Sequence, residues 1–190
     1  MKSIYKPYIF TLISLFFILN SCEKNEEESF FNSKKVQAKN LIELETQPNY
    51  NQGDRMTIKT EFPRILNDNS GQTIDVFASS LTDSYFYNIS LFKKENNNWV
   101  RVNLSQNDVD HSSALLLNNG SLTALCTLNE NTSIYTFSLK LILSQKGSFK
   151  LEVENLLAPY NFESKNGNVN LFIETNIKDL TNNEYLFDVN

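Results

Sequence analysis

Residues 135–153 read YTFSLKLILSQKGSFKLEV, and they carry the clearest structural signal in the chain. Apolar and polar residues alternate on both sides of Ser144–Gly147. Because successive side chains of a β-strand point to opposite faces of a sheet, this alternation predicts two half-buried strands. The short connection with its glycine predicts that the two strands form a hairpin. We expect their apolar sides, with Leu139, Leu141 and Leu151, to lie at the centre of the core.

The same period of two recurs from about Leu41 to the end of the chain. It is clear in Arg55–Phe62, and further alternating stretches lie at 74–78, 85–91, 122–128, 169–173 and 185–189. Segments rich in Asn, Asp and Gly separate them and are typical of turns, among them Asn67–Gly71 and Glu95–Asn98. Short strands at this spacing predict an all-β domain.

The alternation also indicates how the strands pack. A sheet that is polar on one face must bury the other, and two sheets packed face to face achieve this. We therefore expect an immunoglobulin-like antiparallel β-sandwich of about 8–10 strands, with a small β-barrel as the alternative. This folded domain is expected to span residues 41–190.

The first residues of the chain have the composition of an export signal. Lys2 and Lys6 are followed by the apolar run Pro7–Leu19 and then by Ser21-Cys22. A basic segment, an apolar segment and a small residue before the cut make a secretory signal peptide. The run has about 13 residues, whereas a membrane-spanning helix needs about 20. Ending in a cysteine, the segment resembles the bacterial lipoprotein signal. That resemblance implies that residues 1–21 are cleaved and that fatty acyl chains such as palmitate are attached to Cys22.

Residues 22–40 are expected to form a flexible, lipidated tether. The tether starts with the acidic cluster Glu23-Lys24-Asn25-Glu26-Glu27-Glu28 and stays polar beyond it. Like charges repel, so such a linker is extended and solvated. The cluster also resembles the one that follows the lipidated cysteine in surface lipoproteins of Bacteroidota. The resemblance implies an outer-membrane lipoprotein exposed at the cell surface.

A further resemblance covers most of the mature chain. Tyr50–Ile58 and Leu66–Asp75 are similar to the Y-x-x-G-D-x-[IL]-x-[IL] and L-x-D-x-x-[ST]-G-x-x-[IV]-[DE] segments that open a β-sandwich family of Bacteroidota lipoproteins. Phe137–Leu151 resembles the later hairpin of that family, and Tyr185–Val189 resembles its closing strand. Thr57 stands where relatives often carry Trp. The resemblance implies a fold and a cellular address, and it implies no chemistry.

Charge and cysteine content narrow the classes of function. Removal of Lys2 and Lys6 with the signal takes the formal net charge from −5 to about −7. This acidic balance argues against nucleic-acid binding, which needs Lys and Arg to neutralise phosphate. After lipidation of Cys22, Cys126 is the one thiol left, so no disulfide can form within the chain. Cys126 falls on an apolar strand side and is expected to be buried and inert.

Few residues are candidates for catalysis or metal binding. His111 is the single histidine, which argues against a zinc site with several histidines and against a catalytic triad. Asp108 and Asp110 flank it, and we weigh a metal or acid–base role against a solvated loop and favour the loop. Asn67–Gly71 has alternating oxygen ligands but lacks the bidentate Glu of an EF-hand, so we predict a turn. We predict no catalytic residue, no metal and no cofactor.

Aromatic residues are the remaining candidates for a binding site. Exposed rings stack on sugars, and Trp99, Phe86 and Phe92 could act in this way. The alternative, which we favour, is that Trp99 fills the core or that these rings face the second sheet. The long connection Glu154–Asn168 mixes apolar and polar residues and is expected to be a packed cover or a binding loop.

These observations favour a membrane-anchored lipoprotein that acts as a non-catalytic binding or interaction module of the cell envelope. The membrane is its partner through the lipid anchor, and a glycan or an envelope protein is the expected second partner. The alternatives are a structural accessory subunit of an outer-membrane complex and a carboxylate-based glycan hydrolase. Exposed aromatic rings would favour glycan binding, and a contiguous apolar patch would favour a protein partner. Two carboxylates about 5–9 Å apart in a cleft would favour the hydrolase.

Overall fold

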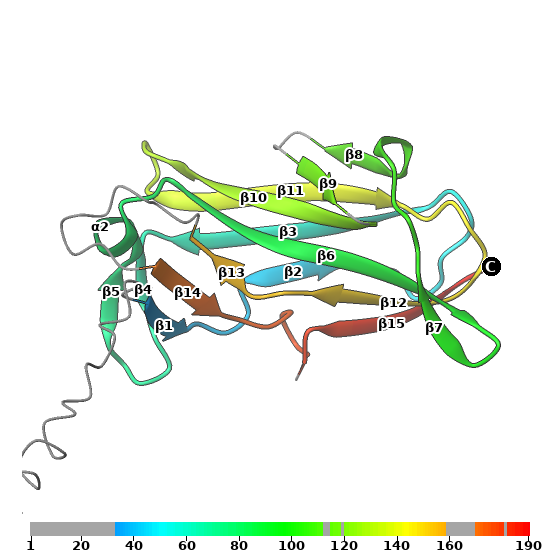
Figure 1. The fold of residues 1–190 in the computed structure, drawn as a ribbon, viewed down its shortest axis with the longest axis horizontal. Helices are drawn as coiled ribbons and strands as arrows, with labels where there is room; N and C mark the ends of the chain where they lie inside the picture. The colour runs from blue at the N-terminus through cyan, green and yellow to red at the C-terminus, as the bar shows by residue number, and fades with distance from the viewer. Residues whose placement is uncertain (1–32, 112–114, 119, 159–169, 181) are drawn as a thin grey trace, which may run out of the picture. The chain divides into compact units, whose positions relative to one another are not determined.

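The structure is a computed structural model that describes residues 33–111, 115–118, 120–158, 170–180 and 182–190. These residues form an all-β fold with one curled sheet of thirteen strands and a small sheet of two strands (Figure 1). The strands are β1 (Ser33–Gln37), β2 (Ile42–Glu45), β3 (Arg55–Pro63), β4 (Ile65–Asn67), β5 (Thr73–Asp75), β6 (Ser84–Glu95), β7 (Asn98–Arg101), β8 (Val109–His111), β9 (Leu115–Asn118), β10 (Ser121–Asn129), β11 (Ile134–Ile142), β12 (Gly147–Val153), β13 (Leu156–Leu157), β14 (Asn170–Glu174) and β15 (Glu184–Val189). Two short helices, α2 (Val76–Ser80) and η1 (Gln106–Asp108), interrupt them. The predicted all-β class is confirmed.

The long strand β6 connects two parts of the curled sheet. Its first half pairs with β10, and from there the sheet continues through β11 and β3 to β2. Its second half pairs with β12 on one edge and with β7 on the other, and β12 pairs with β15. The bridges Ile42–Ile177 and Tyr50–Val189 bring distant strands of this sheet together. The sheet therefore curls over one core, as in a sandwich or half-barrel.

The core follows the period of two in the sequence. Every second residue of β3 from Met56 to Phe62 is buried, and Leu139, Leu141 and Leu151 are almost completely inaccessible, as predicted. Aromatic rings pack at one end, where Phe62 stacks on Tyr135 with 4.8 Å between ring centroids. The burial of alternate side chains is what converts the sequence pattern into a folded sheet.

The predicted hairpin between the strands of residues 135–153 is wrong. β11 pairs with β3, β8 and β10, whereas β12 pairs with β6 and β15. The connection at Ser144 carries the chain from one part of the sheet to the other, and Gly147 begins β12 with φ 133°, a conformation that favours glycine. Both strands still turn their apolar sides to the same core, so the alternation alone did not distinguish the two arrangements.

The start of the domain and the number of strands also differ from the expectation. β1 begins at Ser33, pairs in parallel with β14 and buries Val36 completely, so the folded domain starts within the segment predicted as tether. The described residues form fifteen strands, more than the predicted number of about 8–10. Segments such as β4, β5 and β13 have only two or three residues, which is too short for alternation to be recognised in the sequence. Among the described residues, no helix has the length and apolar character needed to cross a membrane.

Candidate functional site

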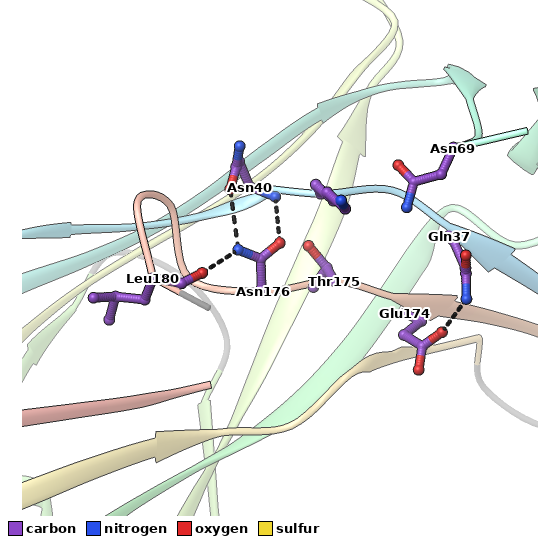
Figure 2. A pocket seen from close by; sticks show the side chains of 8 residues that line it. Gln37, Asn40, Asn69, Glu174, Thr175, Asn176 and Leu180 are labelled. Carbon is purple, nitrogen blue, oxygen red and sulfur yellow. Dashed lines mark hydrogen bonds between the residues drawn. The ribbon is translucent and has the colours of Figure 1, made fainter. Parts of the chain in front are cut away.

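A polar depression of about 540 Å³ lies where the parallel strands β1 and β14 end (Figure 2). The parallel register places Gln37 beside Glu174, and the Gln37 amide donates a hydrogen bond of 2.8 Å to the carboxylate. Beyond the strand ends, the Asn176 carboxamide accepts from the Asn40 backbone N–H and donates to the Asn40 side chain, both at 3.0 Å. It also donates to the Leu180 carbonyl at 2.8 Å. Asn40 and Asn176 therefore hydrogen-bond to each other and join the segments that follow β1 and β14.

The electrostatics of this depression do not support acid–base chemistry. Glu174 is the one carboxylate among the described residues that line it. The hydrogen bond from Lys35 is the largest cause that lowers the pKa of Glu174, and the bond from Gln37 adds to it. A carboxylate held ionised and without a second carboxyl group beside it lacks the pair that glycoside hydrolysis requires. The depression is a polar hollow with a structural role in closing the sheet.

The second candidate is the outer side of β15, β12, β6 and β7. Register pairs Leu186 with Lys150, Lys150 with Phe92, and Phe92 with Arg101, so these four side chains form a row across four strands. Trp99 lies on the same side of β7, two residues before Arg101. We call Phe92, Trp99, Arg101, Lys150 and Leu186 the aromatic face. Trp99 is 37% exposed and Leu186 is 62% exposed, so this face meets the solvent.

Lys150 holds the aromatic face together. Its ammonium group lies 5.0 Å from the ring centroid of Phe92 and 5.7 Å from that of Trp99. The Arg101 guanidinium lies 5.3 Å from the same Phe92 ring. Cations over aromatic faces are attracted by the ring quadrupole, so these contacts fix the orientation of both rings.

Carboxylates surround the ammonium group of Lys150. It forms an ion pair with Glu152 on its own strand and a second, at 3.7 Å, with Glu184 on β15. The hydrogen bond to Glu152 is the largest cause that raises the pKa of Lys150. The aromatic face thus combines fixed rings with charged hydrogen-bond donors and acceptors on an open sheet surface.

Asp108, one of the residues weighed for an acid–base role, is engaged in local structure. Asp108 belongs to η1, where its carboxylate accepts from the backbone N–H and the hydroxyl of Ser105. Burial raises the pKa of Asp108, but the hydrogen bonds from Ser105 and Ser144 together outweigh it and the net shift is downward. Asp110 and His111 lie on β8 opposite Lys140 and Leu139. The side chain of His111 lies outside the described residues.

Two other predictions about candidate residues are confirmed. Asn67–Gly71 lies in the β4–β5 turn, where the Asp68 carboxylate accepts from the backbone N–H groups of Ser70 and Gln72 at 2.9 Å. Cys126 is buried, and burial raises the pKa of its thiol to about 12. Within the described part of the chain, no three His, Cys, Asp or Glu side chains are placed to hold a metal ion.

The favoured expectation for Trp99 is wrong. β7 is a short strand that pairs with β6 through a two-residue turn at Asn96 and Asn97, both with positive φ, and all its residues are exposed. Trp99 therefore reaches neither the core nor a second sheet. Phe92 lies opposite the core side of β6, as predicted, and is partly buried beneath the two cations. Of the loop Glu154–Asn168, residues 154–158 contribute β13, and 159–168 lie outside the described residues.

Sequence reasoning missed Lys150 and Leu186. Both fall on the polar side of alternating strands, so the period of two marks them as outward-facing and says nothing of their neighbours. The rings that lie near Lys150 come from β6 and β7, which are more than fifty residues earlier in the chain. No protein-family model, curated protein or solved structure matches this chain.

Proposed function

We propose that this protein is a lipid-anchored, non-catalytic binding module of the bacterial cell envelope. The observation that carries the proposal is Cys22, placed directly after Ser21 at the end of a basic and then apolar export signal. Two or three acyl chains on this residue would hold the protein durably at a membrane, because each buried CH₂ contributes about 0.8 kcal/mol. The acidic cluster that follows supports placement in the outer membrane and exposure at the cell surface.

The folded domain suits a tethered module. The first described strand begins at Ser33, and ten residues (23–32) lie between it and Cys22 in the sequence. A segment of this length extends at most about 35 Å. The domain would thus act close to the membrane, as expected for a protein that captures a ligand or partner at the envelope.

Binding is favoured over catalysis by the two surfaces described above. In the polar depression the Asn40 and Asn176 amides hydrogen-bond to each other, and the aromatic face is an open surface whose carboxylates pair with Lys150. Neither arrangement resembles a paired acid and base in a cleft. A structural accessory subunit is the second candidate, and the edge strand β7 favours it, because an exposed strand edge can pair with a strand of a partner.

The anchor is tested by replacing Cys22 with alanine in the native host. The expected result is that the variant leaves the membrane fraction, while the wild-type chain stays in it and has a lipid-modified Cys22 as its first residue by mass spectrometry. Cys126→Ala is the matched control, because it also removes one thiol but at a buried position. A Cys22→Ala variant that fractionates with the membrane as the wild type does would refute the lipoprotein assignment.

A further inference from the structure

The aromatic face differs in composition from another outer surface of the sheet. The outward side chains of β3 and β11 include Lys59, Glu61 and Lys140, a polar surface of the ordinary kind. The aromatic face instead presents the ring of Trp99 and the side chain of Leu186 to solvent. A tryptophan ring that is partly packed and partly exposed to water is common at recognition surfaces.

We propose that the aromatic face is a platform for a neutral, hydroxyl-rich glycan. This inference rests on the proposed function, because it names the ligand of that binding module. A pyranose ring presents an apolar face of C–H groups and a periphery of hydroxyl groups. The C–H face packs on the exposed ring of Trp99, and the hydroxyl groups reach the charged residues that surround it.

The charges of this surface match an uncharged ligand. The outward positions of β6, β7, β12 and β15 on this side hold three basic and three acidic residues, namely Lys94, Arg101, Lys150, Glu152, Glu184 and Asp188. Their formal charges cancel, although the chain as a whole is acidic. A sugar hydroxyl both donates and accepts, so it can bond to Glu152 and to Arg101 alike. The surface is therefore complementary to a polar ligand without net charge.

The same ion pairs argue against a protein partner. Lys150 with Glu152 and Glu184 lies at the middle of the face, whereas Lys and Glu are depleted from the centres of protein interfaces. An apolar protein surface over these charges would remove the water that hydrogen-bonds to them and would supply no hydrogen bonds in its place. Glycan hydroxyl groups restore the hydrogen bonds that water makes. A nucleic acid is disfavoured because the face has no excess of basic residues.

The face is also ordered before any ligand arrives. Lys150 fixes Phe92 and Trp99 by its cation–π contacts, and Glu152 and Glu184 in turn hold Lys150. Less side-chain freedom is therefore lost when a ligand binds, and this favours affinity.

Trp99 supplies the test, because it is the single tryptophan of the chain. The full chain in detergent micelles is titrated with four neutral polysaccharides, soluble β-glucan, xylan, mannan and glycogen, while tryptophan emission is recorded. Dextran sulfate is titrated as the anionic comparison. We expect a saturable blue shift with at least one neutral polysaccharide and a weaker response to dextran sulfate. No saturable response to any of the four, or a response to dextran sulfate alone, would overturn the proposal.

Affinity electrophoresis in gels that contain the responding polysaccharide then tests the residue itself. Trp99→Ala is expected to weaken binding by about tenfold or more, and Trp99→Phe, which keeps a ring, is expected to restore part of it. Ile65→Ala is the matched control, because Ile65 is 56% exposed and lies on β4, away from this face. Equal retardation of wild type and Trp99→Ala would refute the site. Neither result affects the membrane fractionation of Cys22→Ala, so failure of the ligand and failure of the anchor are distinguishable.

Discussion

A hydrogen bond between two buried hydroxyl groups crosses the core between β3 and β6. The oxygen atoms of Thr60 on β3 and Tyr87 on β6 are 2.8 Å apart, and each residue is only 1% exposed. Tyr87→Phe removes one partner of this bond, and water cannot reach the buried Thr60 hydroxyl to replace it. A buried hydroxyl that loses its partner costs about 1–3 kcal/mol. Burial raises the pKa of the Cys126 thiol and a hydrogen bond from Thr60 lowers it in part, so this thiol is a second acceptor for the Thr60 hydroxyl. Sulfur is a weak acceptor, so the thiol replaces the lost Tyr87 hydroxyl only in part. We therefore expect Tyr87→Phe to lower the free energy of unfolding by about 1–2 kcal/mol.

The assay is urea and thermal unfolding followed by circular dichroism. Tryptophan emission is a poor probe here, because Trp99 is already exposed in the folded protein. For a domain of this size, 1 kcal/mol corresponds to about 2–4 °C in Tm. Tyr185→Phe is the control, since Tyr185 is a partly exposed residue that stacks on Phe187, and we expect a change within about 0.5 kcal/mol.

A double-mutant cycle separates the hydrogen bond from the loss of an oxygen atom. Thr60→Val alone leaves the Tyr87 hydroxyl unpaired and is expected to cost about as much as Tyr87→Phe. Removing both partners leaves no unpaired group, so the double variant is expected to be more stable than the sum of the single changes by about 1 kcal/mol. Strictly additive effects, or a Tyr87→Phe effect no larger than that of Tyr185→Phe, would refute this reasoning.

Two further predictions concern alkaline stability and the polar depression. Burial is the largest cause that raises the pKa of Tyr85 and of Cys126, each to about 12, from ordinary values of 10.0 and 9.0. As the pH rises, the folded state keeps these protons while the unfolded state loses them. The contribution of these groups to the free energy of unfolding is therefore complete below pH 9 and is lost as the pH rises to about 12. The loss is up to about 1.4 kcal/mol per pH unit for each group. Urea unfolding midpoints measured from about pH 8 to 11 follow this loss of stability. A Cys126→Ala variant is expected to lose stability less steeply with pH than the wild type. An unchanged dependence of the midpoint on pH would contradict the role of burial. Asn176→Ala removes the amide that links Asn40 to Leu180 and is expected to lower the free energy of unfolding by about 1–3 kcal/mol in the same assay, whereas a loss below about 0.5 kcal/mol would show that the amides do not close the sheet.

The sequence predicted what depends on local periodicity and missed what depends on pairing across the chain. Alternation placed Ile58, Leu141 and Leu151 in the core, and turn residues placed the β6–β7 connection at Asn96. These features follow from the two-residue repeat of a strand and from backbone conformations that Asn tolerates. The partner of each strand is set by the whole fold, so the connection at Ser144 was misread as a hairpin. The aromatic face was missed for the same reason, because register between four strands assembles it.

The two polar surfaces of this protein are distinguished by what their groups do before a ligand arrives. In the depression, the Asn40 and Asn176 amides already donate to and accept from each other, so a ligand there would have to break bonds that close the sheet. On the aromatic face, Glu152 and Glu184 share a single cation while their remaining oxygen lone pairs face water. The ring of Trp99 stays 37% exposed and takes no part in the core. An exposed aromatic residue without a part in the core, beside carboxylates with lone pairs to spare, is better explained by an external ligand than by stability.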